Sequence, residues 1–269
     1  MIITVSIQLI FSIPSFGVLS FNVPGFILWI LMIFSPTISS ITVTGIINGR
    51  TGIKTLLKGF SIWKVGLIWY FAASLFLIAP LIAGIFYFIF GGEAPGIDPS
   101  LTFQVIISYV VFGFFSGPLS EEAGWRGFAL PRLESKYNAL VASLILGIIW
   151  TFWHLPLYFL PDSSQIGIPF PIYMVLVVSI TIIMTWAYNN TNGSLIITVL
   201  IHFCFNFGSV LVVSILGLIS MMVFFIVGAV LIVIYLIFVI VHGGSKKLSR
   251  KPDEEMPFNK IITKEAALK

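Results

Sequence analysis

Charged side chains are scarce in this chain, and their scarcity limits what kind of protein it can be. Only 9% of the 269 residues are Asp, Glu, Lys or Arg, whereas 58% are hydrophobic and the mean hydropathy is +1.10. The length accommodates one polytopic domain, and no soluble domain of useful size is left over. The composition therefore indicates an integral membrane protein.

Cysteine and the local motifs of several enzyme classes are also missing. The single cysteine, Cys204, excludes an intramolecular disulfide, so the fold relies on helix packing. No HExxH or CxxC zinc spacing, P-loop, nucleophile elbow or Rossmann glycine pattern is present, so covalent serine catalysis and nucleotide use lack support. The N-terminus has no basic region and no small-residue cleavage site, which favours a first membrane helix over a removable signal peptide.

The long apolar segments predict an all-α protein with about eight transmembrane helices. Each segment approaches or exceeds the roughly 20 residues that a bilayer requires. The segments are 3–20, 24–47, 65–90, 101–120 (running on towards 130), 139–160, 170–188, 194–216 and 218–241. We therefore expect a membrane domain over 1–242 and a charged cytosolic tail, partly disordered, over 243–269.

The positions of the basic residues support this count. All 14 Lys and Arg residues follow the second, fourth or eighth segment, and the loops on the other side carry only Glu93, Asp98 and Asp162. The positive-inside rule then places both termini in the cytosol. The stretch 49–63 resembles an amphipathic helix lying on anionic lipid, so the basic charge indicates membrane contact and not nucleic-acid binding.

One cluster of charges interrupts the apolar pattern. Glu121, Glu122 and Arg126 stand within six positions. An ionisable group at membrane depth costs at least about 2.5–3.5 kcal/mol, so such groups normally mark a functional site. On a helix, Glu122 and Arg126 are at i,i+4 and can pair, which leaves Glu121 to face something else. A salt bridge that merely ends a helix is the alternative.

Two histidines lie within predicted spans and are natural partners for this cluster. They are His154, and His202 with Asn206 one turn later. Polar side chains in a membrane face the interior of the helix bundle and form hydrogen bonds with one another, so a shared site on three helices is expected. At 1.5 Å per residue, Glu121 lies roughly 15 Å from Pro131 and His202 roughly 12 Å from Ser194, whereas His154 lies about 24 Å from Asn138. The expected depth of His154 in the membrane thus differs by about 10 Å from the depths of Glu121 and His202.

Such a cluster supports three chemistries. A carboxylate and an imidazole can activate water for attack on an amide, with a second His and an Asn stabilising the oxyanion. Glu121, His154 and His202 could instead form a His₂Glu zinc set with an open position. A Glu/His proton relay in a transporter is the third possibility, but no internal repeat is present.

Three motifs in order resemble the CPBP family of CAAX proteases and bacteriocin-processing proteins, also called Abi. The EExxxR motif is Glu121–Arg126, the FxxxH motif is Trp150–His154 with Trp in place of the usual Phe, and the HxxxN motif is His202–Asn206. Each motif alone is weak, whereas all three in order on separate membrane helices are strong. The resemblance covers about residues 100–215.

The resemblance implies an intramembrane endopeptidase with an internal catalytic cavity in a prokaryotic cell membrane. Its expected substrate is a prenylated CAAX-type peptide or another hydrophobic peptide, cleaved near the C-terminus. The favoured mechanism requires no cofactor, and zinc is the alternative. A non-proteolytic protein on the same scaffold, such as an immunity or scaffolding factor, is the competing class. The implied roles are Glu121 as base, His154 as its assistant, His202 and Asn206 at the oxyanion, and Glu122, Arg126 and Trp150 in support.

Overall fold

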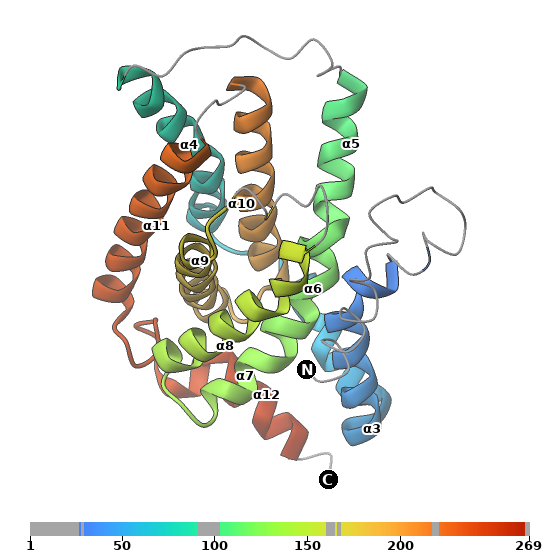
Figure 1. The fold of residues 1–269 in the computed structure, drawn as a ribbon. Coiled ribbons are helices and arrows are strands. Elements are labelled where there is room, and N and C mark those ends of the chain that lie inside the picture. The colour runs from blue at the N-terminus through green and yellow to red at the C-terminus, as the bar shows by residue number, and fades with distance from the viewer. Residues whose placement is uncertain are drawn as a thin grey trace.

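The computed structural model describes residue 27 and residues 30–90, 103–159, 165, 168–216 and 221–266. Every regular element in these ranges is helical (Figure 1). The predicted helix over 3–20 and the acidic residues Glu93, Asp98 and Asp162 lie outside the described residues. The expected all-α fold is confirmed.

The longer helices follow the apolar segments of the sequence. Within these ranges each segment from 24–47 to 218–241 overlaps a helix or a run of short helical elements. The long helices are α3 (Ser35–Leu57), α4 (Leu67–Ile89), α5 (Phe103–Phe114), α8 (Ala139–Trp153), α9 (Phe170–Asn190), α10 (Leu195–Leu216) and α11 (Met221–Gly243).

Among the residues that the structure describes, four helical segments are long and apolar enough to cross a membrane. They are Leu67–Ile89, Ala139–Phe159, Phe170–Asn190 and Ile226–Gly243, and Leu195–Gly208 is a shorter apolar helix. The chain is therefore an integral membrane protein, whereas the count of eight spans remains a prediction. Within Ile226–Gly243 only 11% of residues are buried, so α11 presents most of its surface outward.

The most buried helix is α9, which lies in the middle of the bundle against α8, α10 and α11 (Figure 1). Close packing of the bundle uses small residues, as in many membrane proteins. At Gly208 on α10, an added Cβ would lie 2.6 Å from the carbonyl oxygen of Phe76 on α4. Gly124 approaches Pro36 of α3 equally closely. The backbones meet because neither glycine has a side chain.

A glycine interrupts α3. Gly49 has φ 59° and ψ −157°, which divides α3 into a part before it and a second part that continues into the 3₁₀ turn η2 (Lys58–Ser61). The division falls where the sequence predicted the amphipathic stretch to begin. In that stretch Gly52, Leu56 and Gly59 are buried, while Lys54 and Lys58 are exposed.

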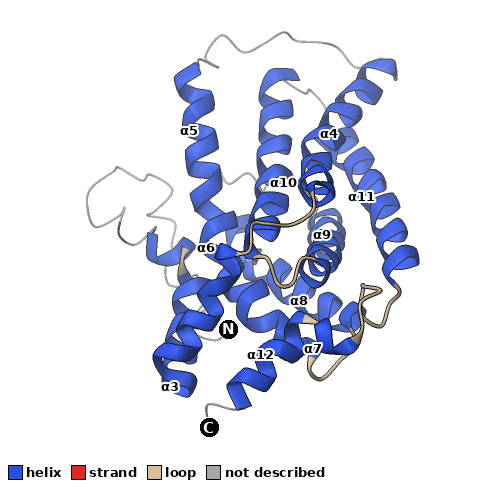
Figure 2. Cartoon of the chain, turned by 180° about the vertical axis from the view of Figure 1, so that it is seen from behind, coloured by secondary structure: helices blue, strands red, loops and turns tan. Residues whose placement is uncertain are grey.

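The segment after α11 packs against one end of the bundle. The backbone N–H groups of Ala139 and Leu140, at the start of α8, donate to the carbonyls of Lys246 and Ser245. Leu248 is completely buried. The chain then forms α12 (Pro257–Ala266), which lies beside α7 (Leu130–Glu134) in Figure 2. The charged composition of 243–269 did not predict these contacts.

Candidate active site

The Glu121–Arg126 segment lies just after a break in the fourth apolar stretch. The π-helical turn η3 (Phe115–Leu119) contains Gly117, with φ 129° and ψ −77°, followed by Pro118, which has no N–H to donate. Ser120 accepts a hydrogen bond from the Gly117 N–H through its hydroxyl (2.9 Å). The chain continues through α6 (Ser120–Glu122) and a second π-helical turn, η4 (Ala123–Ala129). π-Helical turns occur frequently at functional sites.

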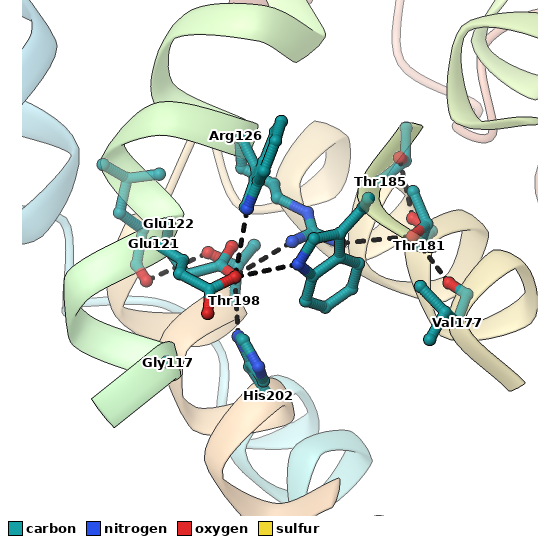
Figure 3. Close-up of polar contacts among 12 residues, drawn as sticks. Gly117, Glu121, Glu122, Arg126, Val177, Thr181, Thr185, Thr198 and His202 are labelled. Carbon is teal, nitrogen blue, oxygen red and sulfur yellow. Dashed lines mark hydrogen bonds and ion pairs between the residues drawn. The ribbon is translucent and has the colours of Figure 1, made fainter. Parts of the chain in front are cut away.

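Glu122 is the centre of a buried ionic cluster (Figure 3). Its Oε1 accepts hydrogen bonds from Arg126 Nη1 and from His202 Nδ1, both at 2.9 Å. Glu122 and Arg126 are completely buried, and His202 is 3% exposed. The predicted i,i+4 pair is therefore confirmed, and Glu122 additionally fixes the orientation of His202 from a helix 80 residues further along the chain.

Glu121 points away from this ion pair. Its Oε2 accepts hydrogen bonds from two indoles, Trp125 Nε1 at 3.0 Å and Trp150 Nε1 at 2.8 Å. Its Oε1 makes no hydrogen bond within the part of the chain that the structure describes. Each of the two adjacent carboxylates uses one oxygen in these contacts, but their partners differ: Glu122 Oε1 lies between a guanidinium and an imidazole, and Glu121 Oε2 lies between two indoles.

Three polar atoms converge beside Gly117. A Cβ placed on Gly117 would lie 3.5 Å from Glu121 Oε1, 3.6 Å from Asn206 Nδ2 and 3.6 Å from His202 Nε2. Since glycine has no such atom, this space is open to a ligand. The structure therefore brings together Glu121, His202 and Asn206, from η3–α6 and α10, around one small volume.

His154 lies at the edge of this cluster. It follows the last residue of α8, and its Nδ1 donates to the carbonyl of Trp150 (2.9 Å). Its ring packs edge-on against Trp150, Trp153 and Tyr173. Among the described residues it makes no hydrogen bond to Glu121, in keeping with its offset depth in the sequence. Trp150 connects the two, because its indole contacts both.

Aromatic and hydroxyl groups enclose Arg126. Its Cζ lies 4.3 Å from the centre of the Trp150 ring, a cation–π contact. Its Nη2 donates a long hydrogen bond of 3.4 Å to Thr181 on α9. A buried ion pair is strongly destabilised when one member is lost, so these contacts help to fix the geometry around Glu122.

The alternative zinc set remains a prediction. In the described ranges, no group of three or more His, Cys, Asp or Glu side chains is placed to hold a metal ion together. One nitrogen of each histidine and one oxygen of Glu121 make hydrogen bonds to other groups of the chain.

Sequence reasoning missed three features that shape the site. Trp125 stands four residues after Glu121, the same spacing that predicted the Glu122–Arg126 pair, so its contact had a readable signal. The Gly117-Pro118 dipeptide signals a break but not that polar groups would gather there. Tyr173, against His154, belongs to another helix and gave no signal in the sequence.

The fold and the site define a class of protein: a helical membrane protein with a Glu/His/Asn cluster inside its helix bundle. Residues 102–208 match the family described as type II CAAX prenyl endopeptidase Rce1-like. This range contains all three motifs, so the predicted resemblance to CAAX-type intramembrane proteases is confirmed over it.

A curated relative supports the same assignment. The chain is 31% identical over 128 residues to "CAAX prenyl protease 2" of Methanococcus maripaludis. The alignment covers 44% of this chain and 46% of the relative. The matched part therefore spans just under half the length of that protein.

Proposed function

We propose that this chain is an intramembrane endopeptidase that hydrolyses a peptide bond with water activated by Glu121. The convergence of Glu121 Oε1, His202 Nε2 and Asn206 Nδ2 on the open space at Gly117 carries the proposal. A base and two hydrogen-bond donors around one volume are what amide hydrolysis requires. The family match and the name of the relative support the same reaction class.

The chemistry follows from these positions. Glu121 Oε1 takes a proton from a water molecule, whose oxygen attacks the scissile carbonyl carbon. The carbonyl oxygen becomes an oxyanion and accepts hydrogen bonds from His202 Nε2–H and Asn206 Nδ2. Glu121 then gives its proton to the leaving nitrogen as the C–N bond breaks. The Nδ1–H of His154 is engaged, so its Nε2 is the nitrogen that assists the water.

Glu122 has a separate role in this scheme. With Glu122 accepting from Nδ1, His202 donates from Nε2 only when both ring nitrogens carry protons. The Glu122 carboxylate accepts the Nδ1–H and so orients the ring for that donation. Arg126 on the other side keeps Glu122 in place. In this scheme Glu121 transfers the proton, and Glu122 provides electrostatic support to His202.

The substrate that we propose is a prenylated CAAX-type peptide or a similar hydrophobic C-terminus. The name of the relative supports this choice, and so does an apolar groove of about 320 Å³ between α3, η4 and α8. Trp125 lines the groove while its indole holds Glu121. An isoprenoid chain in the groove would lie next to the carboxylate.

We also propose that the end of the bundle at which α4, α8 and α10 begin faces the cytosol, with both termini on that side. The hydrogen bond from Ser194 to the carbonyl of Ile62, and those of Ala139 and Leu140 to the tail, place these helix starts at one end. Apart from Arg126, the described Lys and Arg residues lie in segments at this end.

Cleavage of a defined peptide by the purified protein tests the proposal. We expect a farnesylated peptide ending in a CAAX sequence to be cut, with the bond identified by product mass spectrometry. Glu121→Gln retains an acceptor for both indoles but removes the base, so activity should fall by about 10²–10⁴-fold. Glu134→Gln, which alters a buried glutamate outside the site, is the matched control.

Two results would overturn the proposed function. Cleavage that persists in Glu121→Gln would remove Glu121 from the reaction. The absence of any cut peptide in a library, together with a cellular phenotype that Glu121→Gln still disrupts, would favour a non-proteolytic role. Metal analysis addresses the mechanism separately: stoichiometric zinc in the purified protein, lost in His154→Ala, would contradict a water activated by glutamate alone.

A further inference from the structure

A second cavity lies at the end of the bundle where the basic residues gather. Its volume is about 160 Å³, and it is enclosed by the last part of α3, η2, the turn before α10 and the amphipathic helix α12. None of Glu121, His154, His202 and Asn206 lines it. We call this cavity the basic pocket, after the four cationic residues in its lining: Lys58, Arg132, Lys260 and Lys264.

The charge of the basic pocket is one-sided. Its cations come from three different elements, η2, α7 and α12, and its described lining contains no acidic residue. Arg132 is held in place, since its guanidinium donates to the Phe128 carbonyl and lies 3.7 Å from the Phe128 ring centre. Lys58, Lys260 and Lys264 add like charges from two separate elements, and these charges attract an anion.

One buried hydroxyl group lacks a partner in this lining. Thr44 is 2% exposed, and its hydroxyl has no hydrogen-bond partner among the described residues. Tyr188 also lines the pocket and brings a second hydroxyl that can donate a hydrogen bond. Buried polar groups are nearly always hydrogen-bonded, so Thr44 points to an acceptor that binds here.

The pocket lies where the helices enter the membrane. Ile62 is part of its lining, and the next residue, Trp63, is 58% exposed. Leu67, at the start of α4, is 84% exposed. Exposed Trp at the end of an apolar helix is typical of the boundary between headgroups and hydrocarbon. A ligand in the pocket is therefore at the depth of lipid headgroups.

We propose that the basic pocket binds the phosphate group of an anionic membrane phospholipid. The cavity is smaller than the roughly 300–1,000 Å³ of pockets for drug-sized molecules, which suits a headgroup and not a whole ligand. Phosphate oxygens accept hydrogen bonds from lysine, arginine and hydroxyl donors. A zwitterionic headgroup would bring its own ammonium group against four cations, so the anionic class is selected.

Binding to the full-length protein in neutral detergent tests this proposal. The probes are short-chain phosphatidylglycerol, short-chain phosphatidylcholine and inorganic phosphate, with the shift in unfolding temperature giving an apparent affinity. We expect phosphatidylglycerol to bind at least tenfold more tightly than the other two. Lys260→Gln with Lys264→Gln should lower that affinity at least tenfold, and Tyr188→Phe should lower it several-fold.

The control removes the same charge elsewhere at the same end. Lys246→Gln with Arg250→Gln lies outside the pocket and should change the affinity less than twofold. An equal loss in both double variants, or no loss in either, would overturn the proposal in favour of general charge attraction or a different site. Binding of inorganic phosphate alone would overturn the lipid as the source of the phosphate.

Discussion

Gly117 occupies the point on which the polar side chains converge. Its φ of 129° lies in the region that favours glycine, and an added Cβ would stand in the space between Glu121, His202 and Asn206. We expect Gly117→Ala to lose at least about 100-fold in activity, because the substrate carbonyl is displaced. The strained backbone should also lower stability by about 1–3 kcal/mol.

Gly113→Ala is the matched control for this substitution. Gly113 lies one turn earlier on α5 with ordinary helical backbone, and a Cβ there would meet only Phe203 at 3.8 Å. Its activity and thermal unfolding should stay close to those of the unmodified protein. Equal activity losses in the two variants would show that helix disturbance, not the occupied space, is responsible.

Trp150 offers a second test at the scale of one residue. Trp150→Phe keeps an aromatic ring against Arg126 and His202 but removes the indole N–H that Glu121 accepts at 2.8 Å. A hydrogen bond to a charged group is worth about 1.5–3 kcal/mol, so kcat should fall roughly tenfold or more with little change in KM.

Trp186→Phe provides the comparison, since Trp186 is also buried but packs against Trp69 and Tyr235 away from the site. Steady-state kinetics of both variants give the answer. An unchanged kcat in Trp150→Phe would mean that the Trp125 indole alone is sufficient to orient Glu121.

Local spacing predicted the contacts within one helix but not those between helices. Glu122 and Arg126 pair as the i,i+4 rule requires. The contact between Glu122 and His202 joins residues 80 positions apart, and periodicity says nothing about which helices face each other. The motifs predicted that His202 would belong to the site, but not that Glu122 would hold it.

At the scale of elements, the junction of α7 with α9 contains a buried acid outside the spans. Glu134 is 5% exposed, and its Oε1 accepts a hydrogen bond from Asn189 Nδ2 at 2.6 Å. Burial raises the pKa of Glu134 to about 8, against the opposing effect of the Asn189 hydrogen bond. The folded protein therefore prefers the neutral carboxylic acid at this position.

The resulting pH dependence has a definite sign. The unfolded chain loses this proton near its ordinary pKa of 4.5, whereas the folded chain holds it until about pH 8. Stability from this group is fully present below pH 4.5 and is lost as pH rises towards 8. Glu134→Gln stays neutral and can still accept from Asn189. We expect its unfolding temperature to exceed that of the unmodified protein at pH 8–9.

At pH 5 the two proteins should unfold at similar temperatures, which makes the pH series its own control. Parallel curves for both proteins over this range would contradict the prediction. Activity at pH 7 should be unaffected, since Glu134 does not touch the candidate active site.

Helix positions were predictable, whereas irregular helical turns were not. The apolar runs predicted where α4, α8, α9 and α10 lie, because each run approaches or exceeds the length of a membrane span. The π-helical turns around Glu121 depend on packing against α3 and α10, which the sequence does not display. The division of α3 at Gly49 falls where the sequence predicted the amphipathic stretch to begin.

At the scale of the whole molecule, the segment after α11 is part of the fold. Leu248 is completely buried, and the neighbouring carbonyls of Lys247 and Leu248 accept hydrogen bonds from Asn189 and Asn190. Leu248→Ala should lower stability by about 2–5 kcal/mol, the usual cost of such a core deletion. Lys246→Ala, which removes an exposed side chain from the same segment, should change it by no more than about 0.5 kcal/mol.

Thermal unfolding in detergent measures both variants. Equal stability in the two would mean that the segment contributes nothing to the fold. Composition did not predict this segment's contacts because they use backbone carbonyls and one leucine, and neither stands out among the Lys and Arg residues around them.

The lone cysteine gives this protein a practical property. Cys204 is 7% exposed within α10, where a thiol reagent in water has little access, and the chain has no other sulfhydryl. A cysteine introduced at an exposed loop position can therefore be labelled with little labelling of Cys204. Membrane-impermeant maleimides applied to intact cells would then show on which side of the membrane each loop lies, without first replacing any native residue.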